Sequence, residues 1–139
     1  MVLLIDTNVV LDYLLKREPH YVNAVQLIDY CTNSEMKCHI AFHSMSTIWY
    51  HLRKHFDLKE RRQLLLSVTD LLTVTGASHN AVVVAILNED FPDFEDCLQE
   101  KCALQCGADY IVTRNVKDFA ASKIPAVTPA KMCEIISQS

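Results

Sequence analysis

The stretch that decides the fold is a short apolar run that ends abruptly in polar side chains, Val2-Leu3-Leu4-Ile5-Asp6-Thr7-Asn8. Four bulky apolar residues bounded by polar ones predict a strand that is buried on both faces, as at the centre of a parallel sheet. Asp6 and Asn8 then lie just beyond the strand. Ligands of open α/β sheets bind in the crevice at the carboxyl ends of the strands, so both side chains are offered to the expected binding site.

The residues after this run continue without glycine or proline and predict a helix over residues 9–15. Asp6 and Thr7 therefore have two alternative roles. Asp and Thr are ordinary N-cap residues, and either side chain can accept a hydrogen bond from the first helical turn. Alternatively, Asp6 supplies a carboxylate to chemistry at the sheet edge. The second role is favoured if further acidic residues converge on the same edge.

Length and composition predict one domain, residues 1–139, with a substantial core, because half of the residues are hydrophobic and only two glycines and four prolines interrupt them. The net charge of −4 argues against a broad basic surface for nucleic-acid binding, although carboxylates that hold a metal opposite phosphates also make a chain acidic. No basic segment precedes the first apolar run, and no run approaches the ~20 apolar residues that cross a bilayer. We therefore expect a cytoplasmic protein without a membrane segment.

The cysteines contain no C-x-x-C pair, and the six positions are Cys31, Cys38, Cys97, Cys102, Cys106 and Cys133. Two of them lie one helical turn apart in an expected helix. We therefore expect all six to be reduced core residues, as in cytosolic proteins, with a structural zinc site as the alternative.

Apolar spacing and turn residues predict alternating strands and helices along the rest of the chain. Further strands are expected over residues 38–42, 72–75, 109–113 and 125–127. Helices are expected over residues 20–32, 43–52, 57–72, 78–87, 93–106 and 128–136. The capping-box pattern of Asp57 with Glu60 and the position of Gly107 after a helix support these bounds. The alternation predicts an α/β fold with a parallel sheet of about five strands and right-handed crossovers.

Acidic residues occur at three places that such a sheet can bring together. Asp6 follows the first strand, and Asp118 lies just beyond the strand that ends at Thr113, so both belong to one edge of the sheet. The third place is the start of the expected helix over residues 93–106, with Asp93, Glu95 and Asp96. The preceding helix leaves room for this helix to begin near the strand ends. The sequence therefore permits the acids to converge.

Each of these acids also has a structural alternative. Asp93 is a plausible N-cap with Asp96 three positions on, and acids in a first turn suit the helix dipole. Asp118 is alternatively a solvated loop acid or a cap, and Glu95 alternatively faces water.

Three motifs in this order resemble those of PIN domains, and within that family those of the VapC-type ribonuclease toxins of bacteria and archaea. With h for an apolar residue, residues 4–9 are similar to the family's opening hhDTNh. Residues 96–109 are similar to its helix D-A-h-x-x-x-x-A-h-x-x-G-A-x, and residues 111–119 to hhTRNxxDF. The resemblance runs along the whole chain with compatible spacing, which makes the combination more specific than any one motif.

The resemblance implies a doubly wound parallel sheet with helices on both faces, and an acidic pocket that binds Mg²⁺ or Mn²⁺. Three carboxylates would form that metal site: Asp6, Asp96 and Asp118. Further catalytic support is carried over to Asn8, Thr113 and Asn115, with Asp93 and Glu95 as supporting or substitute ligands. Oxygen ligands of this kind suit Mg²⁺ or Mn²⁺ better than zinc.

One position departs from the family pattern, because Thr47 stands where the family normally carries a Glu. A hydroxyl can hydrogen-bond a metal-bound water but adds no negative charge. Two functions therefore stay open. One is a metal-dependent endoribonuclease that hydrolyses RNA phosphodiester bonds as the toxin of a toxin–antitoxin pair. The other is a catalytically weakened or inactive PIN-fold module that binds RNA or protein.

The same resemblance implies partners. It implies a homodimer and a small antitoxin protein that inserts an Arg or Lys into the acidic groove. Arg114 and Lys117 are adjacent to the expected pocket in sequence and are candidates for contacting the RNA backbone. His51 and His55 are four residues apart and would suit a shared metal, but they lack the Glu of an H-E-x-x-H motif, so surface histidines are favoured.

Overall fold

The apolar run at the start of the chain forms the central strand of a sheet, as predicted. The computed structural model describes residues 1–33 and 35–139. Within them, five strands form one parallel sheet in the order β3-β2-β1-β4-β5. The strands are β1 (Val2–Ile5), β2 (Lys37–Ala41), β3 (Thr73–Thr75), β4 (Tyr110–Val112) and β5 (Ala126–Val127). Because both neighbours of β1 are strands, its backbone is fully paired.

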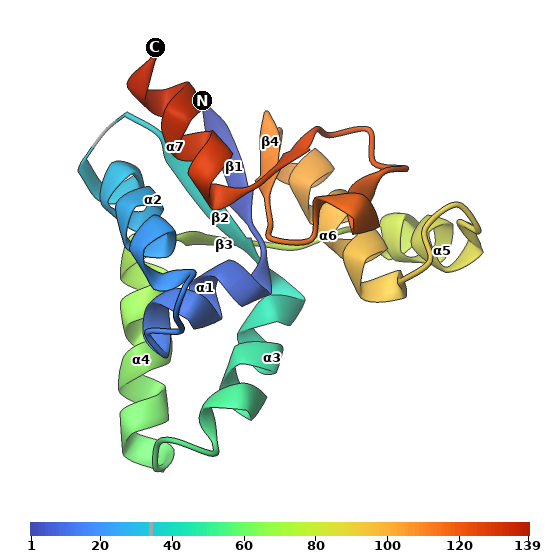
Figure 1. The fold of residues 1–139 in the computed structure, drawn as a ribbon. Helices are drawn as coiled ribbons and strands as arrows, with labels where there is room; N and C mark the ends of the chain where they lie inside the picture. Colours follow the sequence, from blue (N-terminus) through green and yellow to red (C-terminus); the bar gives the residue numbers. More distant parts are fainter. Residues whose placement is uncertain (34) are drawn as a thin grey trace.

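Helices follow the strands in the predicted alternation (Figure 1). In the described residues, seven α-helices are present: α1 (Thr7–Leu14), α2 (Tyr21–Asn33), α3 (Phe42–Leu52), α4 (Leu58–Leu71), α5 (His79–Leu87), α6 (Phe94–Cys106) and α7 (Pro129–Ser137). A 3₁₀-helix, η1 (Val116–Phe119), lies between β4 and β5. It forms because backbone hydrogen bonds between residues three apart close a turn there. The α/β fold class is confirmed.

Helices cover both faces of the sheet. Leu3 and Ile5 are fully buried in a core with α1, α2, α3, α4 and α7, whereas Leu4 is fully buried in a second core with α5, α6 and η1. Successive side chains of a strand point to opposite faces, so one strand serves both cores. Figure 1 shows α5 and α6 on one side of the sheet and α2, α4 and α7 on the other. This is the two-sided arrangement that the resemblance implies.

Local signals at helix ends are also confirmed. Asp57 Oδ1 accepts a hydrogen bond of 2.8 Å from Glu60 N–H, and Glu60 Oε1 accepts one of 3.3 Å from Asp57 N–H, which completes the capping box of α4. Gly107 ends α6 with a φ of 69°, in the left-handed region that glycine adopts without steric cost. Among the described helices, none is long and apolar enough to cross a membrane.

The cysteine prediction is wrong for two of the six residues. Cys31 in α2 and Cys38 in β2 form a disulfide, with their Cα atoms 5.8 Å apart. The others are free thiols, as expected: Cys97, Cys102, Cys106 and Cys133. The pair was missed because bridging requires the last turn of α2 and the start of β2 to lie side by side, which cysteine spacing does not reveal.

Candidate active site

A polar cavity of about 200 Å³ lies at the carboxyl edge of the sheet. The elements around it are the end of β1, the start of α1, helix α3, the start of α6 and η1 with the residues before it. The lining residues are Asp6, Thr7, Asn8, Thr47, His51, Asp93, Glu95, Asp96, Asn115 and Asp118. All of them except Thr7 and His51 are candidates from the sequence. We call this the acidic cavity, because five of its side chains are carboxylates.

Asp6 is a helix cap and a cavity carboxylate at the same time. Its Oδ1 accepts a hydrogen bond of 2.8 Å from Thr7 N–H, and its Oδ2 accepts one of 2.8 Å from the Thr113 hydroxyl. The residue is only 6% exposed. Burial raises the pKa of Asp6, and the two hydrogen bonds oppose that rise because they stabilise the ionised form. Capping and a place in the site, which the sequence left as alternatives, are therefore combined.

The first turn of α6 concentrates negative charge in the cavity. Asp93 is the N-cap, and its Oδ1 accepts a hydrogen bond of 3.0 Å from Asp96 N–H, as the capping alternative predicts. Burial, and then the charges of the four other cavity carboxylates, raise the pKa of Asp96 to about 7. The carboxylates therefore interact with one another. Such a site favours an arriving cation or proton.

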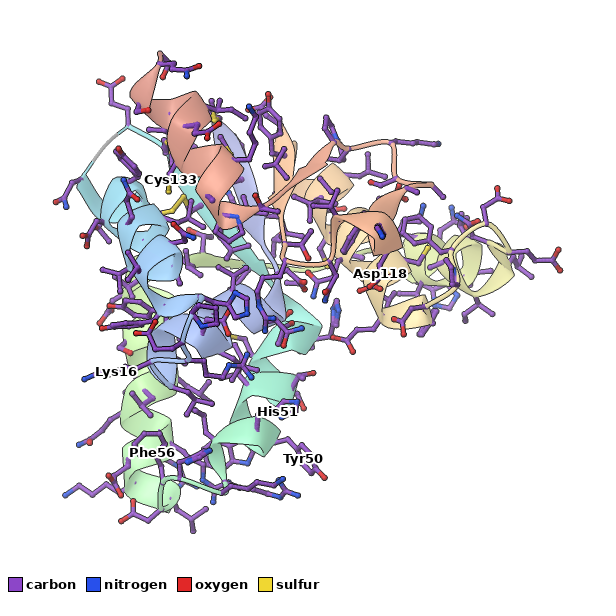
Figure 2. The ribbon with its side chains drawn as sticks, viewed as in Figure 1. Lys16, Tyr50, His51, Phe56, Asp118 and Cys133 are labelled. Atoms are coloured by element: carbon purple, nitrogen blue, oxygen red, sulfur yellow. A yellow bond between two sulfur atoms is a disulfide. The ribbon has the colours of Figure 1, made fainter. Side chains whose placement is uncertain are left out.

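Glu95 and His51 both line the cavity and interact electrostatically. Burial and the charge of Asp93 raise the pKa of Glu95, whereas His51 lowers it. Figure 2 shows His51 on α3 and Asp118 near α6. His51 is exposed, as expected for a surface histidine. It also lines the cavity, which was not predicted. Its spacing of four residues from Thr47 on one helix is the signal that could have found it, because such residues share a face.

Three residues predicted to serve the site lie outside the acidic cavity. Thr113 is fully buried, where its hydroxyl holds Asp6. Arg114 and Lys117 line a neighbouring cavity of about 370 Å³, which shares two of its lining residues with the acidic cavity. They are thus placed beside the carboxylates and not among them.

A buried hydrogen-bond network joins three of the helices that line the cavity. The Thr7 hydroxyl donates to Ser44 Oγ at 2.6 Å, and Gln99 Nε2 donates to Ser44 Oγ at 2.8 Å and to Thr7 Oγ1 at 3.3 Å. Ser44 and Gln99 are fully buried. The network ties α1, α3 and α6 together, and each of these helices contributes residues to the cavity. Sequence reasoning missed Ser44 and Gln99, because each is one of several polar residues in its helix and local sequence does not reveal which of them is buried against a distant partner.

The donor set of the acidic cavity fits a hard divalent cation. It offers five carboxylates and the amide oxygens of Asn8 and Asn115, and oxygen ligands suit Mg²⁺ and Mn²⁺. In the part of the chain that the structure describes, no three His, Cys, Asp or Glu side chains are already grouped as a metal site. A cation would relieve the repulsion between carboxylates, which adds to the effect of burial in raising the pKa of Asp96.

Solved structures with this fold come from several organisms. A chain of VapBC2 from Rickettsia felis aligns with a TM-score of 0.68 at 17% identity, covering 92% of this chain and 98% of that one. A toxin–antitoxin complex from Klebsiella pneumoniae gives 0.67 at 21% identity, with 91% and 96% covered. PAE2754 from Pyrobaculum aerophilum gives 0.65 at 16% identity, with 100% and 91% covered. At these identities the likeness shows a shared fold.

Sequence comparison assigns the family. No curated protein matches the chain. A family profile described as PIN domain matches residues 2–117, which is most of the chain. These residues include the central strand, α6 and most of the acidic cavity. The chain therefore belongs to the PIN domain family.

Proposed function

We propose that this protein is a divalent-metal-dependent endoribonuclease that acts as the toxin of a toxin–antitoxin pair. The observation that carries the proposal is one cavity that collects Asp6, Asp96 and Asp118 from three separate segments. Membership of the PIN domain family supports nuclease activity. The toxin role draws on solved structures of the same fold that are themselves toxin–antitoxin complexes.

Mg²⁺ or Mn²⁺ would be held by Asp6, Asp96 and Asp118, with Asp93 and Glu95 in support. When bound, the ion supplies positive charge that polarises the phosphate and lowers the pKa of a coordinated water. These five carboxylates would position the ion over the bond that is cut. No nucleophilic serine or cysteine is required.

The chain's own residues would hold the substrate and move a proton. One of the cavity carboxylates would accept the proton that the attacking water loses. The hydrogen bonds from Thr7 and Thr113 keep Asp6 in one orientation. The amide groups of Asn8 and Asn115 line the cavity and would donate to phosphate oxygens.

The second candidate function is a PIN-fold module that binds RNA or protein without cutting RNA. Thr47 favours it, because this side chain lines the cavity where the family normally has a Glu. Its hydroxyl donates to the His43 carbonyl at 3.3 Å within α3 and brings no charge. Asp93 and Glu95 line the same cavity and would replace the missing carboxylate if the protein is active.

Two protein partners belong to the proposal. The first is a second copy of this chain, because α5 leaves four apolar side chains exposed: Val83, Val84, Ile86 and Leu87. Figure 1 shows α5 at one end of the molecule, beyond α6. Exposed apolar clusters of this kind mark protein-interaction surfaces. The second partner is an antitoxin, for which the acidic cavity would accept an Arg or Lys side chain.

RNA cleavage by the purified protein tests the proposal directly. We expect cleavage with Mn²⁺ or Mg²⁺, no cleavage with EDTA, and loss of cleavage in Asp96→Asn. The matched control is Asp90→Asn, which removes the same charge from an exposed position outside the acidic cavity and should cut normally. Cleavage that survives EDTA and Asp96→Asn would contradict the proposal.

A thermal-shift titration separates the two candidate functions. We expect Mn²⁺ to raise the melting temperature of the wild type and of Asp90→Asn but not that of Asp6→Asn. An equal absence of response in all three proteins, together with RNA binding in a separate assay, would favour the non-cutting module.

A further inference from the structure

We propose that a second cavity next to the acidic one binds an RNA phosphate that flanks the phosphate to be cut. The cavity has a volume of about 170 Å³ and is lined by His20, Asn23, Arg114, Thr128, Pro129 and Ala130. It lies between the start of α2, the residue after Thr113 and the start of α7. We call it the phosphate cavity. The inference rests on the proposed function for the identity of the polymer as RNA. The positive charge of the phosphate cavity does not depend on a bound metal.

The phosphate cavity and the acidic cavity both border the neighbouring cavity around residues 114–118. That middle cavity shares Asn115 and Asp118 with the acidic cavity. It shares Arg114 and Thr128 with the phosphate cavity. Lys117 also lines it. The shared residues place the middle cavity beside each of the other two, and we propose that an extended polymer lies along this row.

A charge cluster around the buried carboxylate of Asp12 gives the phosphate cavity a positive side chain, Arg114. Asp12 is 1% exposed, and its carboxylate lies 2.8 Å from Arg17 Nε and 2.8 Å from Arg114 Nε. Two guanidinium groups thus share one carboxylate, which leaves one net positive charge. Arg114, which lines the cavity, is the cation nearest to a bound anion.

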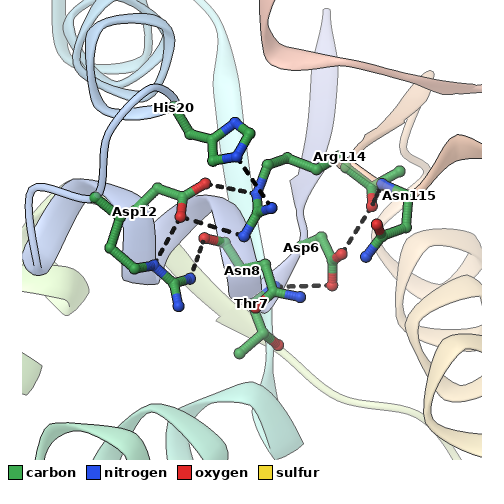
Figure 3. A network of polar contacts seen from close by, with 9 residues as sticks. Asp6, Thr7, Asn8, Asp12, His20, Arg114 and Asn115 are labelled. Atoms are coloured by element: carbon green, nitrogen blue, oxygen red, sulfur yellow. Dashed lines mark hydrogen bonds and ion pairs between the residues drawn. The ribbon is translucent and has the colours of Figure 1, made fainter.

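The guanidinium of Arg114 is held in place before any ligand arrives. Its Nη2 donates to Asp12 Oδ1 at 3.3 Å, and its Nη1 lies 3.3 Å from His20 Nε2 (Figure 3). A guanidinium that is already oriented loses little side-chain freedom when it binds an anion. The structure therefore offers a prepared cation and not a mobile surface side chain.

The remaining lining groups suit an oxyanion. Asn23 brings an amide that can donate hydrogen bonds. The Thr128 hydroxyl accepts from Lys131 N–H at 3.1 Å and caps α7, and Pro129 occupies the first turn. In this turn Pro129 has no N–H and the Lys131 N–H is bound to Thr128, so the N–H of Ala130, which lines the cavity, is the backbone donor that the turn offers to an anion.

RNA fits the three cavities better than an acidic peptide does. A chain of carboxylates leaving the phosphate cavity would meet the five carboxylates of the acidic cavity and find no partner there. An RNA strand would instead carry its next phosphate to the cation that the acidic cavity is proposed to bind. Phosphate contacts of this kind fix the position of the polymer without selecting its sequence.

The test measures RNA binding without catalysis, by fluorescence polarisation of a labelled single-stranded RNA in EDTA. Asn23→Asp places a negative charge in the phosphate cavity and, as an acid in the first turn of α2, should not harm folding. Asn80→Asp is the matched control, because it makes the same change in the first turn of α5 at an exposed position. We expect Asn23→Asp to weaken binding about tenfold, and Asn80→Asp to bind like the wild type.

A titration with inorganic phosphate, followed by NMR, locates the site. We expect the amide signals of Arg114 and Ala130 to shift in the wild type and much less in Asn23→Asp. Equal RNA affinities for Asn23→Asp and Asn80→Asp would overturn the proposal. So would stronger binding of a poly-glutamate peptide than of RNA.

This result is separable from the nuclease proposal. If Asn23→Asp weakens RNA binding but no metal ion supports cleavage, then the phosphate cavity stands and the nuclease proposal fails. If RNA is cut with Mn²⁺ but Asn23→Asp binds and cuts like Asn80→Asp, then the nuclease stands and the phosphate cavity is wrong.

Discussion

The Thr113 hydroxyl donates a hydrogen bond of 2.8 Å to Asp6 Oδ2. The two residues directly follow the paired strands β4 and β1. The same hydroxyl oxygen accepts from Asn115 N–H at 3.0 Å. Thr113 thereby fixes the Asp6 carboxylate and the turn that leads to η1. One buried side chain holds two of the segments that deliver acids to the cavity.

Thr113→Val tests this link, because it removes the hydroxyl while keeping the shape of the side chain. We expect a loss of about 1–3 kcal/mol in the free energy of unfolding, since a buried carboxylate loses a donor. The pKa of Asp6 should also rise further. Urea denaturation monitored by circular dichroism measures the first effect. Thr113→Ser keeps the hydroxyl and is the control, and a Val variant as stable as the Ser variant would show that the hydrogen bond contributes little.

The pH dependence of the metal-free protein should report on Asp96. Its pKa is raised from 3.8 to about 7 in the folded protein, so the folded state binds the proton more tightly than the unfolded chain does. The stability associated with this group is therefore present at low pH and is lost as the pH rises towards 7. Asp96→Asn should be more stable than the wild type by on the order of 1 kcal/mol near pH 8, a value reduced by partial solvent exposure.

The same comparison near pH 4 is the internal control, because Asp96 is then neutral in the folded protein and the substitution should change stability little. Denaturation in EDTA at both pH values makes the measurement. A stabilisation of equal size at both values would contradict the assignment. Metal affinity of the wild type should rise with pH up to about 7, because the ion competes with the proton.

Thr47→Glu should strengthen metal binding, because it adds a carboxylate to a cavity that its side chain already lines. We expect at least about a tenfold increase in Mn²⁺ affinity by isothermal titration calorimetry, as one further charge at close range implies. Without metal, the added charge should lower the melting temperature. Ser46→Glu adds the same charge at the neighbouring exposed position and should bind Mn²⁺ like the wild type.

The apolar surface of α5 is tested by Ile86→Lys. Ile86 is 64% exposed, and we expect the substitution to shift the protein from dimer to monomer in sedimentation velocity, since a charge in an apolar interface is left without a partner. Val22 on α2 is 65% exposed, so Val22→Lys is a matched control that should stay dimeric. A monomeric wild type, or equal behaviour of both variants, would rule out this surface as the interface.

Local sequence patterns were enough to predict most of the fold. The apolar run that ends in Asp6, the capping box of α4 and the glycine after α6 depend on neighbours a few residues away, and all three are confirmed. The disulfide between Cys31 and Cys38 was missed because it depends on how a helix end and a strand lie against each other.

The residues of the candidate site also fall into two groups, those that local sequence patterns predicted and those that only the structure revealed. The identity of Asp6, Asp96 and Asp118 as candidates came from motifs and from their positions at element ends. The participation of His51, the support from Ser44 and Gln99 and the pairing of Arg114 with Asp12 did not. These contacts join residues that are tens of positions apart, or that have no distinguishing local pattern.

The sequence by itself determined where strands and helices lie and which acids are candidates for the carboxyl edge of a parallel sheet, because side-chain period and end residues act over short distances. Only the tertiary structure decided that five carboxylates share one cavity, that Asp6 both caps α1 and lines that cavity, and that Arg114 forms an ion pair with Asp12. Burial and mutual charge arise only when distant segments pack together, so the raised pKa of Asp96 is a property of the fold and not of the motif.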